Sequence, residues 1–342
     1  MIFLLRQVLI FCIFLSFSSL AQDAEFSQYY AAQMYLNPSL IGFEDQSALS
    51  LSTRTQWQSI NQTFTTQQAS FHFPIYTKEK LIKTGAFGLS FYQNSSSDGS
   101  FKTLGINANL VINAILSERS LMSFGIQAGV IQKNLDLNNF NWSSQYDPFI
   151  GFDASIDPGV RNLSDNTLFP DIGAGIVYGN NLDFHGEDEG VGFYTGLSAF
   201  HLNQPNEALG TEEESELPIL FKHIGGLAFT IGPKTEITPN YLINYQKLNY
   251  QINLGISSSY QLRSENGSSL IPTHAIGGVW HRINDAFIFI AGLQARNYII
   301  GFSYDMNSSS LRRDGFGTSA YEISLTLMNS KKGMKKIHSP RI

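Results

Sequence analysis

The sequence contains few residues arranged for catalysis. Its seven histidines are scattered, and none stands in an HExxH motif or in another i,i+4 pair. Residues 196–200 read GLSAF and lack the last glycine of a nucleophile elbow. No Walker or dinucleotide-binding fingerprint is present. We therefore expect no enzymatic activity and no cofactor.

Two clusters of carboxylates are the only candidates for a metal site. They lie at residues 183–189 and 212–216. Carboxylate oxygens can bind Ca²⁺, but neither cluster has the alternating ligand spacing of a known calcium loop. We favour solvated loops over a metal site.

The overall composition excludes several classes of protein. The chain has 342 residues, a net charge of -6, 15% charged residues, 13% aromatic residues and one cysteine. Soluble domains average about 25% charged residues, so this chain is unusually poor in charge. Its acidic balance argues against nucleic-acid binding, and one cysteine cannot form a disulfide framework. Beyond the N-terminus no apolar run approaches the roughly 20 residues of a transmembrane helix.

The body of the chain alternates apolar and polar residues with a period of two, which is typical of strands with two different faces. Most of these segments are 8 to 12 residues long, whereas soluble strands average about 5 or 6 residues and membrane-spanning strands need about 9 to 11. We count fourteen predicted strands, with an uncertainty of about two, at residues 48–57, 67–75, 85–92, 104–112, 122–130, 171–178, 191–202, 220–231, 236–245, 249–260, 274–281, 286–293, 297–305 and 320–327.

An up-and-down meander of this size must close, because an unpaired edge is not tolerated in a bilayer. We therefore predict an all-β fold, a closed antiparallel transmembrane β-barrel over residues 48–328. A soluble β-sandwich or propeller is the less favoured alternative. The three longest predicted connections, 133–170, 203–218 and 306–318, all fall on one side of such a barrel, as outer loops do. Aromatic residues near strand ends could form interfacial girdles, namely Phe91, Tyr92, Phe193, Tyr194, Tyr241, Tyr245, Tyr250, Trp280 and Tyr304.

Both ends of the chain differ from the body. Residues 1–21 resemble a secretory signal peptide, with Arg6, an apolar stretch and a Ser-Leu-Ala cleavage pattern; an uncleaved anchor is the less favoured alternative. Residues 22–47 would then lie in the periplasm or tuck into the lumen. A basic tail, residues 329–342, carries Lys331, Lys332, Lys335 and Lys336. The tail either binds an acidic periplasmic partner or stays solvated, and we favour the solvated state.

Several motifs resemble one known family. The predicted mature chain opens with Phe26-Ser27-Gln28-Tyr29 and continues to Asn37-Pro38-Ser39, and the first strand contains Arg54-Thr55-Gln56-Trp57. Further matches are residues 169–175, 196–202, 301–305 and 321–323. This pattern resembles the PorP/SprF family of type IX secretion system membrane proteins from Bacteroidetes. Ala24, Ser39 and Tyr321 depart from the family pattern, which leaves the subgroup open.

The resemblance implies an outer-membrane barrel that binds a large secreted adhesin, including gliding adhesins, and supports its secretion or attachment. It also implies other type IX components, periplasmic ones among them, as partners beside outer-membrane lipid. The aromatic residues of the longest loop, Phe140, Trp142, Tyr146 and Phe149, would either meet that partner or plug the barrel, and we weigh these alternatives equally.

Arg54 lies on the polar face of its strand, so it would point into the lumen and either pair with an acid, which we favour, or set ion selectivity. A passive porin is the alternative function, and an outer-membrane lipase is a third that no residue spacing supports.

Overall fold

The computed structural model describes residues 25–57, 63–77, 82–96, 99–137, 140–159, 165–180, 191–209, 214–263, 271–308 and 319–329. The predicted signal peptide, residues 1–21, and the predicted basic tail from Lys331 to Lys336 lie outside these residues. Among the residues described, no helix is long and apolar enough to cross a membrane.

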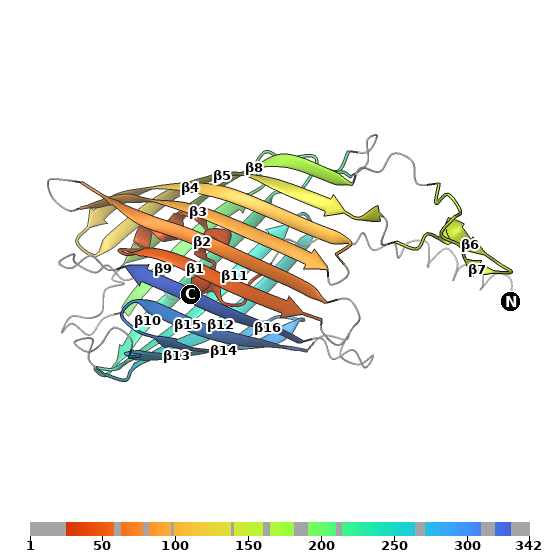
Figure 1. Cartoon of the computed structure of the whole chain (residues 1–342). Helices are drawn as coiled ribbons and strands as arrows, with labels where there is room; N and C mark the ends of the chain where they lie inside the picture. Colours follow the sequence, from red (N-terminus) through yellow and green to blue (C-terminus); the bar gives the residue numbers. More distant parts are fainter. Residues whose placement is uncertain are drawn as a thin grey trace, which may run out of the picture.

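The strands form a closed antiparallel barrel, which confirms the predicted fold and the predicted count of fourteen wall strands. Each wall strand pairs with its neighbour in the chain, and β1 pairs with β16 to close the wall (Figure 1). The wall consists of β1 (Ser47–Gln56), β2 (Phe64–Tyr76), β3 (Lys83–Ser96), β4 (Phe101–Ser117), β5 (Ser120–Leu135), β8 (Asn166–Asn180), β9 (Val191–Phe200), β10 (Leu220–Ile231), β11 (Thr235–Gln246), β12 (Asn249–Gln261), β13 (His274–Arg282), β14 (Ala286–Gln294), β15 (Tyr298–Asn307) and β16 (Ser319–Asn329).

The barrel has two unlike rims. We call the end where β1 begins and β16 ends the terminal rim, and the opposite end the loop rim. The two longest connections, 136–165 and 201–219, are both at the loop rim, as expected. The connection 262–273 at the terminal rim is one residue longer than 308–318 at the loop rim, so the prediction that the three longest connections share one side is wrong in that detail.

One long connection at the loop rim extends away from the barrel. It contains η4 (Ser143–Gln145), β6 (Tyr146–Asp147) and β7 (Gly151–Phe152). We call residues 140–159 the arm. The arm projects well beyond the wall strands in Figure 1.

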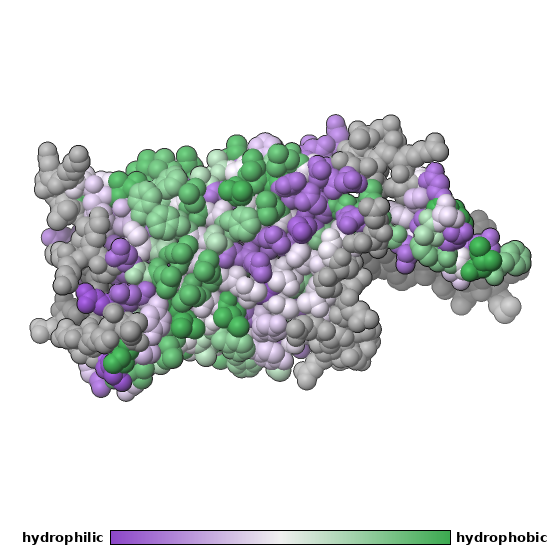
Figure 2. Space-filling model, in the orientation of Figure 1, coloured by the Kyte–Doolittle hydropathy of each residue, from purple (hydrophilic) through white to green (hydrophobic). Residues whose placement is uncertain are grey.

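Alternation along the strands places apolar side chains outside and polar ones inside. In β1, Leu49 and Leu51 are exposed on the outer surface, whereas Ser50, Ser52 and Arg54 are buried. Figure 2 shows the resulting hydrophobic band over the barrel wall. The hydrophobic content of the chain is therefore largely an outward-facing surface rather than a core.

The aromatic residues divide between the two faces. Phe91, Phe193, Tyr245, Tyr250 and Tyr304 are exposed on the outside. The prediction of an interfacial position is wrong for Tyr92, Tyr194 and Trp280, which lie on the inner face. Residues that follow one another in a strand point to opposite faces, so Phe91 and Tyr92 cannot both meet lipid, nor can Phe193 and Tyr194.

Candidate functional site

The N-terminal segment fills the lumen. Residues 25–46, which we call the plug, contain η1 (Tyr29–Ala31), α2 (Gln33–Leu36) and η2 (Pro38–Phe43). Isolated helices this short are not stable in water, so contacts with the wall must hold them. The plug lies inside the wall strands in Figure 1.

The plug runs through the lumen from one rim towards the other. Glu25 accepts a hydrogen bond of 3.1 Å from Gln251, near the start of β12, at the loop rim. Asp45 forms an ion pair of 2.9 Å with Lys83, the first residue of β3, at the terminal rim. The described chain therefore begins near the loop rim and passes back through the barrel before it enters β1.

At its first residues the plug meets a cluster of buried charges. Arg54 Nη2 lies 2.9 Å from Asp305 Oδ2, so the guanidinium pairs with an acid, as we favoured. Ser27 bridges this pair, because its hydroxyl accepts from Arg54 Nη1 at 2.6 Å and donates to Asp305 Oδ2 at 2.8 Å. The backbone N–H groups of Ser27 and Gln28 donate to Glu322 Oε2 at 2.7 and 3.3 Å. We call Ser27, Gln28, Arg54, Asp305 and Glu322 the clasp.

The side chain of Gln28 is held as closely as its backbone. Its Nε2 donates to the backbone carbonyl of Glu322 at 2.8 Å, and its Oε1 accepts from Ser324 and from Tyr30, both at 2.6 Å. Burial raises the pKa of Tyr30 to about 12, which extends to higher pH the range in which its hydroxyl can donate to Gln28. Ser27 and Gln28 are thus held by individual hydrogen bonds to the wall rather than by a diffuse charged surface.

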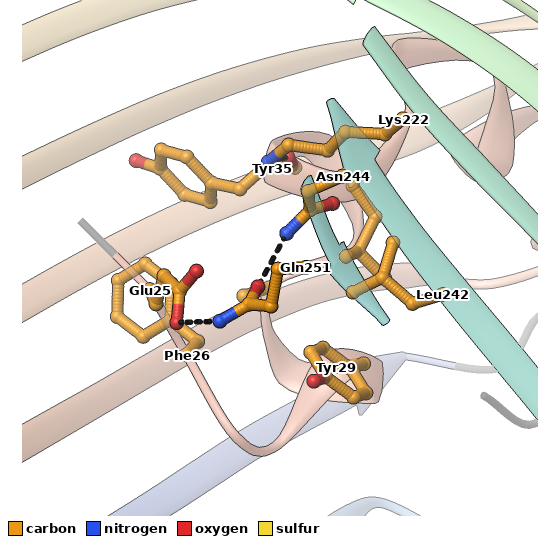
Figure 3. A pocket seen from close by; sticks show the side chains of 10 residues that line it. Glu25, Phe26, Tyr29, Tyr35, Lys222, Leu242, Asn244 and Gln251 are labelled. Atoms are coloured by element: carbon orange, nitrogen blue, oxygen red, sulfur yellow. Dashed lines mark hydrogen bonds between the residues drawn. The ribbon is translucent and has the colours of Figure 1, made fainter. Parts of the chain in front are cut away.

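A second arginine extends the charged cluster to the loop rim. Arg282 lies 3.0 Å from Asp285, 3.6 Å from Asp305 and 3.7 Å from Glu25. Beside it, Tyr29 packs edge-on against Trp280, with ring centroids 5.0 Å apart. Figure 3 shows Glu25, Gln251 and Asn244 linked by two hydrogen bonds along the wall.

The second half of the plug is held by close packing and by neutral hydrogen bonds to the wall. Asn37 accepts from Ser39 N at 2.9 Å and thereby caps η2, while its amide donates to the carbonyls of Ile176 and Leu197 at 3.2 and 2.9 Å. Glycines of the wall leave the space that this turn occupies. A Cβ at Gly175 would lie 2.1 Å from Asn37 Oδ1, and one at Gly125 would lie 2.7 Å from Ser39 N.

Plug and wall pack closely at the residues that the structure describes, and Leu40, Ile41 and Phe43 are almost fully buried against wall side chains. The cavity drawn in Figure 3 has a volume of about 30 Å³ and is lined by Phe26, Tyr35, Lys222 and seven other residues. The described plug therefore occupies the lumen.

The structure brings together most of the motif residues selected from the sequence. Phe26, Ser27, Gln28, Tyr29, Asn37, Pro38 and Arg54 all lie between plug and wall, with side chains that are buried. The later motifs supply the wall side of the same interface, namely Asp305, Glu322, Gly175 and Ser198. The motifs at residues 169–175 and 196–202 also meet directly, because His201 Nδ1 lies 2.7 Å from Asp171 Oδ1.

Other selected residues lie elsewhere. Gln56 ends β1 at the loop rim, and Trp57 is 39% exposed and packs edge-on against Phe64. Phe140, Trp142 and Tyr146 lie in the arm and not in the lumen. Lys331, Lys332, Lys335 and Lys336 lie outside the described residues.

The arm exposes apolar side chains to solvent. Phe149 is 95% exposed and Ile150 is 73% exposed. Asp147 Oδ1 accepts from the backbone N–H groups of both, at 2.7 and 3.2 Å, and so fixes the turn that displays them. The alternative that these aromatic residues plug the barrel is wrong, because residues 25–46 occupy the lumen.

No catalytic or metal-binding geometry is visible in the described ranges. Within them, no group of three His, Cys, Asp or Glu side chains could hold a metal ion. The carboxylate cluster at 183–189 and part of that at 212–216 lie outside these ranges. The candidate site is therefore the plug, its receptor in the wall and the exposed arm.

Comparisons with known proteins agree with this architecture. The crystal structure of the toluene transporter TbuX from Ralstonia pickettii has a TM-score of 0.51 at 10% sequence identity, and the match covers 87% of this chain and 92% of that one. The structure of a Pseudomonas aeruginosa FadL homologue has a TM-score of 0.43 at 12% identity, covering 87% and 93% of the two chains. At 10% identity the likeness to TbuX shows only the fold of an outer-membrane barrel. None of the curated proteins matches the chain. A family model described as "Type IX secretion system membrane protein PorP/SprF" matches residues 18–327.

Proposed function

The chain belongs to the PorP/SprF family of type IX secretion system membrane proteins, and from this membership we propose that it binds a large secreted adhesin and supports its secretion or surface attachment. The filled lumen is the observation that supports this function over a passive porin. A porin needs an open path for solutes, whereas here residues 25–46 lie inside the barrel and pack against its wall. The barrel then serves as a non-enzymatic anchor that acts through its surfaces.

On this proposal the loop rim faces the cell exterior and the arm contacts the adhesin. The arm offers a fixed apolar tip, with Phe149 and Ile150 displayed on the turn that Asp147 caps. Apolar and aromatic side chains at the centre of an interface supply much of its binding energy. The terminal rim, and the basic tail with Lys331 to Lys336, would then face other type IX components in the periplasm.

A deletion strain tests the proposal at two levels. Loss of the whole chain should abolish surface display of the adhesin, and re-expression of the parent chain should restore it. The variant Phe149→Ser with Ile150→Ser should restore the barrel in the outer membrane but reduce surface display at least fivefold. Leu248→Ser is the matched control, because Leu248 is 85% exposed at the same rim but lies outside the arm.

The outcomes separate the candidate functions. Normal display in the deletion strain would contradict the proposal. Stable ion conductance of the purified parent chain in planar bilayers would favour the porin instead.

A further inference from the structure

The pairing of β1 with β16 differs from the other contacts in the wall. Every other pair of neighbouring wall strands is also joined directly by the chain, whereas β1 and β16 are the two ends of the meander. Their ten residue pairs run from Ser47↔Asn329 to Gln56↔Ala320. Until they form, both strands have open edges, which are prone to pair with other chains. We call this pairing the seam.

The clasp lies directly on the seam. Arg54 of β1 and Glu322 of β16 are paired residues in the register across it. Asp305 belongs to β15, the strand next to β16. Both sides of the seam therefore turn a buried charge towards the same point in the lumen.

Two residues of the plug bind both sides at once. Ser27 Oγ contacts Arg54 on one side of the seam and Asp305 on the other. The N–H groups of Ser27 and Gln28 and the amide of Gln28 all donate to Glu322. The two backbone N–H groups donate to the carboxylate of Glu322, and the Gln28 amide donates to its backbone carbonyl, so these charge-assisted contacts stabilise the closed seam only when the plug is bound.

We propose that Arg54, Asp305 and Glu322 form a binding site for a Ser-Gln peptide segment, and that occupation of this site by Ser27 and Gln28 closes the seam. The natural ligand is the N-terminal segment of the same chain. The barrel thus closes around its own plug, and an empty barrel keeps an open β1–β16 edge. This role is independent of adhesin binding.

Distances across the seam test the proposal. In a Cys12→Ser background, one spin-label pair is placed at Thr53→Cys and Ile323→Cys, which are paired on the outer face of the seam. A reference pair is placed at Ile106→Cys and Val130→Cys, which are paired on the outer face of β4 and β5. Each label pair is measured in the full chain and in two variants.

The two variants each remove one hydroxyl between plug and wall. Ser27→Ala removes the clasp hydroxyl, while Ser198→Ala removes a donor to the carbonyl of Leu36 at 2.6 Å, on β9 and away from the seam. We expect Ser27→Ala to produce a second, longer distance at 53/323 in at least a fifth of the molecules and no change at 106/130. We expect Ser198→Ala to leave both distances unchanged.

Two results would overturn the proposal. One is a narrow 53/323 distance in a third variant that combines Ser27→Ala with Gln28→Ala; the other is equal broadening at both label pairs in Ser27→Ala, which would indicate general loosening. If Ser27→Ala fails to fold, the cysteines at positions 53 and 323 of that variant are cross-linked with a short bifunctional reagent during refolding. Recovery of the compact, SDS-resistant barrel to at least half of the parent level supports a defect at the seam. The absence of any recovery refutes the proposal.

Discussion

The two halves of the plug are held by different physical means. Residues 25–30 are fixed by charge-assisted hydrogen bonds to Arg54, Asp305 and Glu322. Residues 34–43 are fixed by close packing and neutral hydrogen bonds: Leu40, Ile41 and Phe43 are almost fully buried, wall glycines make space for the turn, and Asn37 donates to two wall carbonyls. Charged networks give specificity because each partner must be present, whereas close packing responds to volume. Disturbing one half at a time therefore distinguishes recognition of the plug from its packing.

The largest effect is expected from breaking the charged half. Arg54→Met leaves Asp305 and Glu322 buried beside each other without the nearer guanidinium. Removing one member of a buried ion pair costs about 3–5 kcal/mol. The free energy of unfolding from urea titration in detergent should fall by that amount. A loss below about 1 kcal/mol would mean that Arg282, 3.6 Å from Asp305, compensates the charge on its own.

A smaller effect is expected from overfilling the packed half. Gly125→Val adds a Cβ that would lie 2.7 Å from Ser39 N and 2.8 Å from Pro38 C. Both are backbone atoms that cannot rotate away, so the plug turn must shift, at a cost of about 1–3 kcal/mol. The emission of Trp280, buried against Tyr29, should stay blue-shifted if only this half moves. This emission is measured in a protein that also carries Trp57→Phe and Trp142→Phe, so that Trp280 is its only tryptophan.

The control for this variant is Gly277→Val. Glycine 277 is also in a wall strand, but the nearest atom to an added Cβ there is 4.0 Å away. Equal destabilisation by both variants would show that glycine loss from any strand, and not contact with the plug, is responsible.

A third prediction concerns the junction between the halves. Asn37→Ala removes the cap of η2 and two donors to wall carbonyls. Loss of such a cap costs about 0.5–2 kcal/mol. The urea midpoint should fall accordingly, and amide hydrogen exchange should increase in residues 38–43 but not in residues 27–28. Faster exchange in both regions would show that the two halves release together.

The wall was predictable from sequence because alternation is a local signal. Each of the fourteen strands appears in the sequence as a segment in which apolar and polar residues alternate. In the first of them, Leu49, Leu51 and Thr53 face outward as the pattern predicts. Strand ends were less predictable. β4 and β5 extend to 17 and 16 residues, well beyond predicted segments of nine, because paired strands continue past the apolar band where the alternation fades.

The plug could be predicted only in part. The sequence placed residues 22–47 in the periplasm or in the lumen, and it pointed Arg54 inward. It did not reveal Asp305 as the partner, since the two residues are 251 positions apart and meet only across closed strands. The motifs of the family were visible, but their convergence on one interface depends on register, which no local pattern contains.

The smallest predicted effect concerns a single hydrogen bond in the charged half of the plug, the one from Tyr30 to Gln28. Tyr30 donates to Gln28 Oε1 at 2.6 Å, and burial raises the pKa of Tyr30 from 10.0 to about 12. A raised pKa means that the folded state favours the neutral phenol, so this contribution is complete below pH 10 and is lost as the pH rises towards 12.

The parent should therefore exceed Tyr30→Phe in unfolding free energy by about 1 kcal/mol at pH 8, and the difference should vanish between pH 10 and 12. Because Tyr29 and Tyr35 titrate alike in both proteins, the comparison isolates Tyr30. A difference that stays constant to pH 12 would show that the phenol does not titrate with the plug in place.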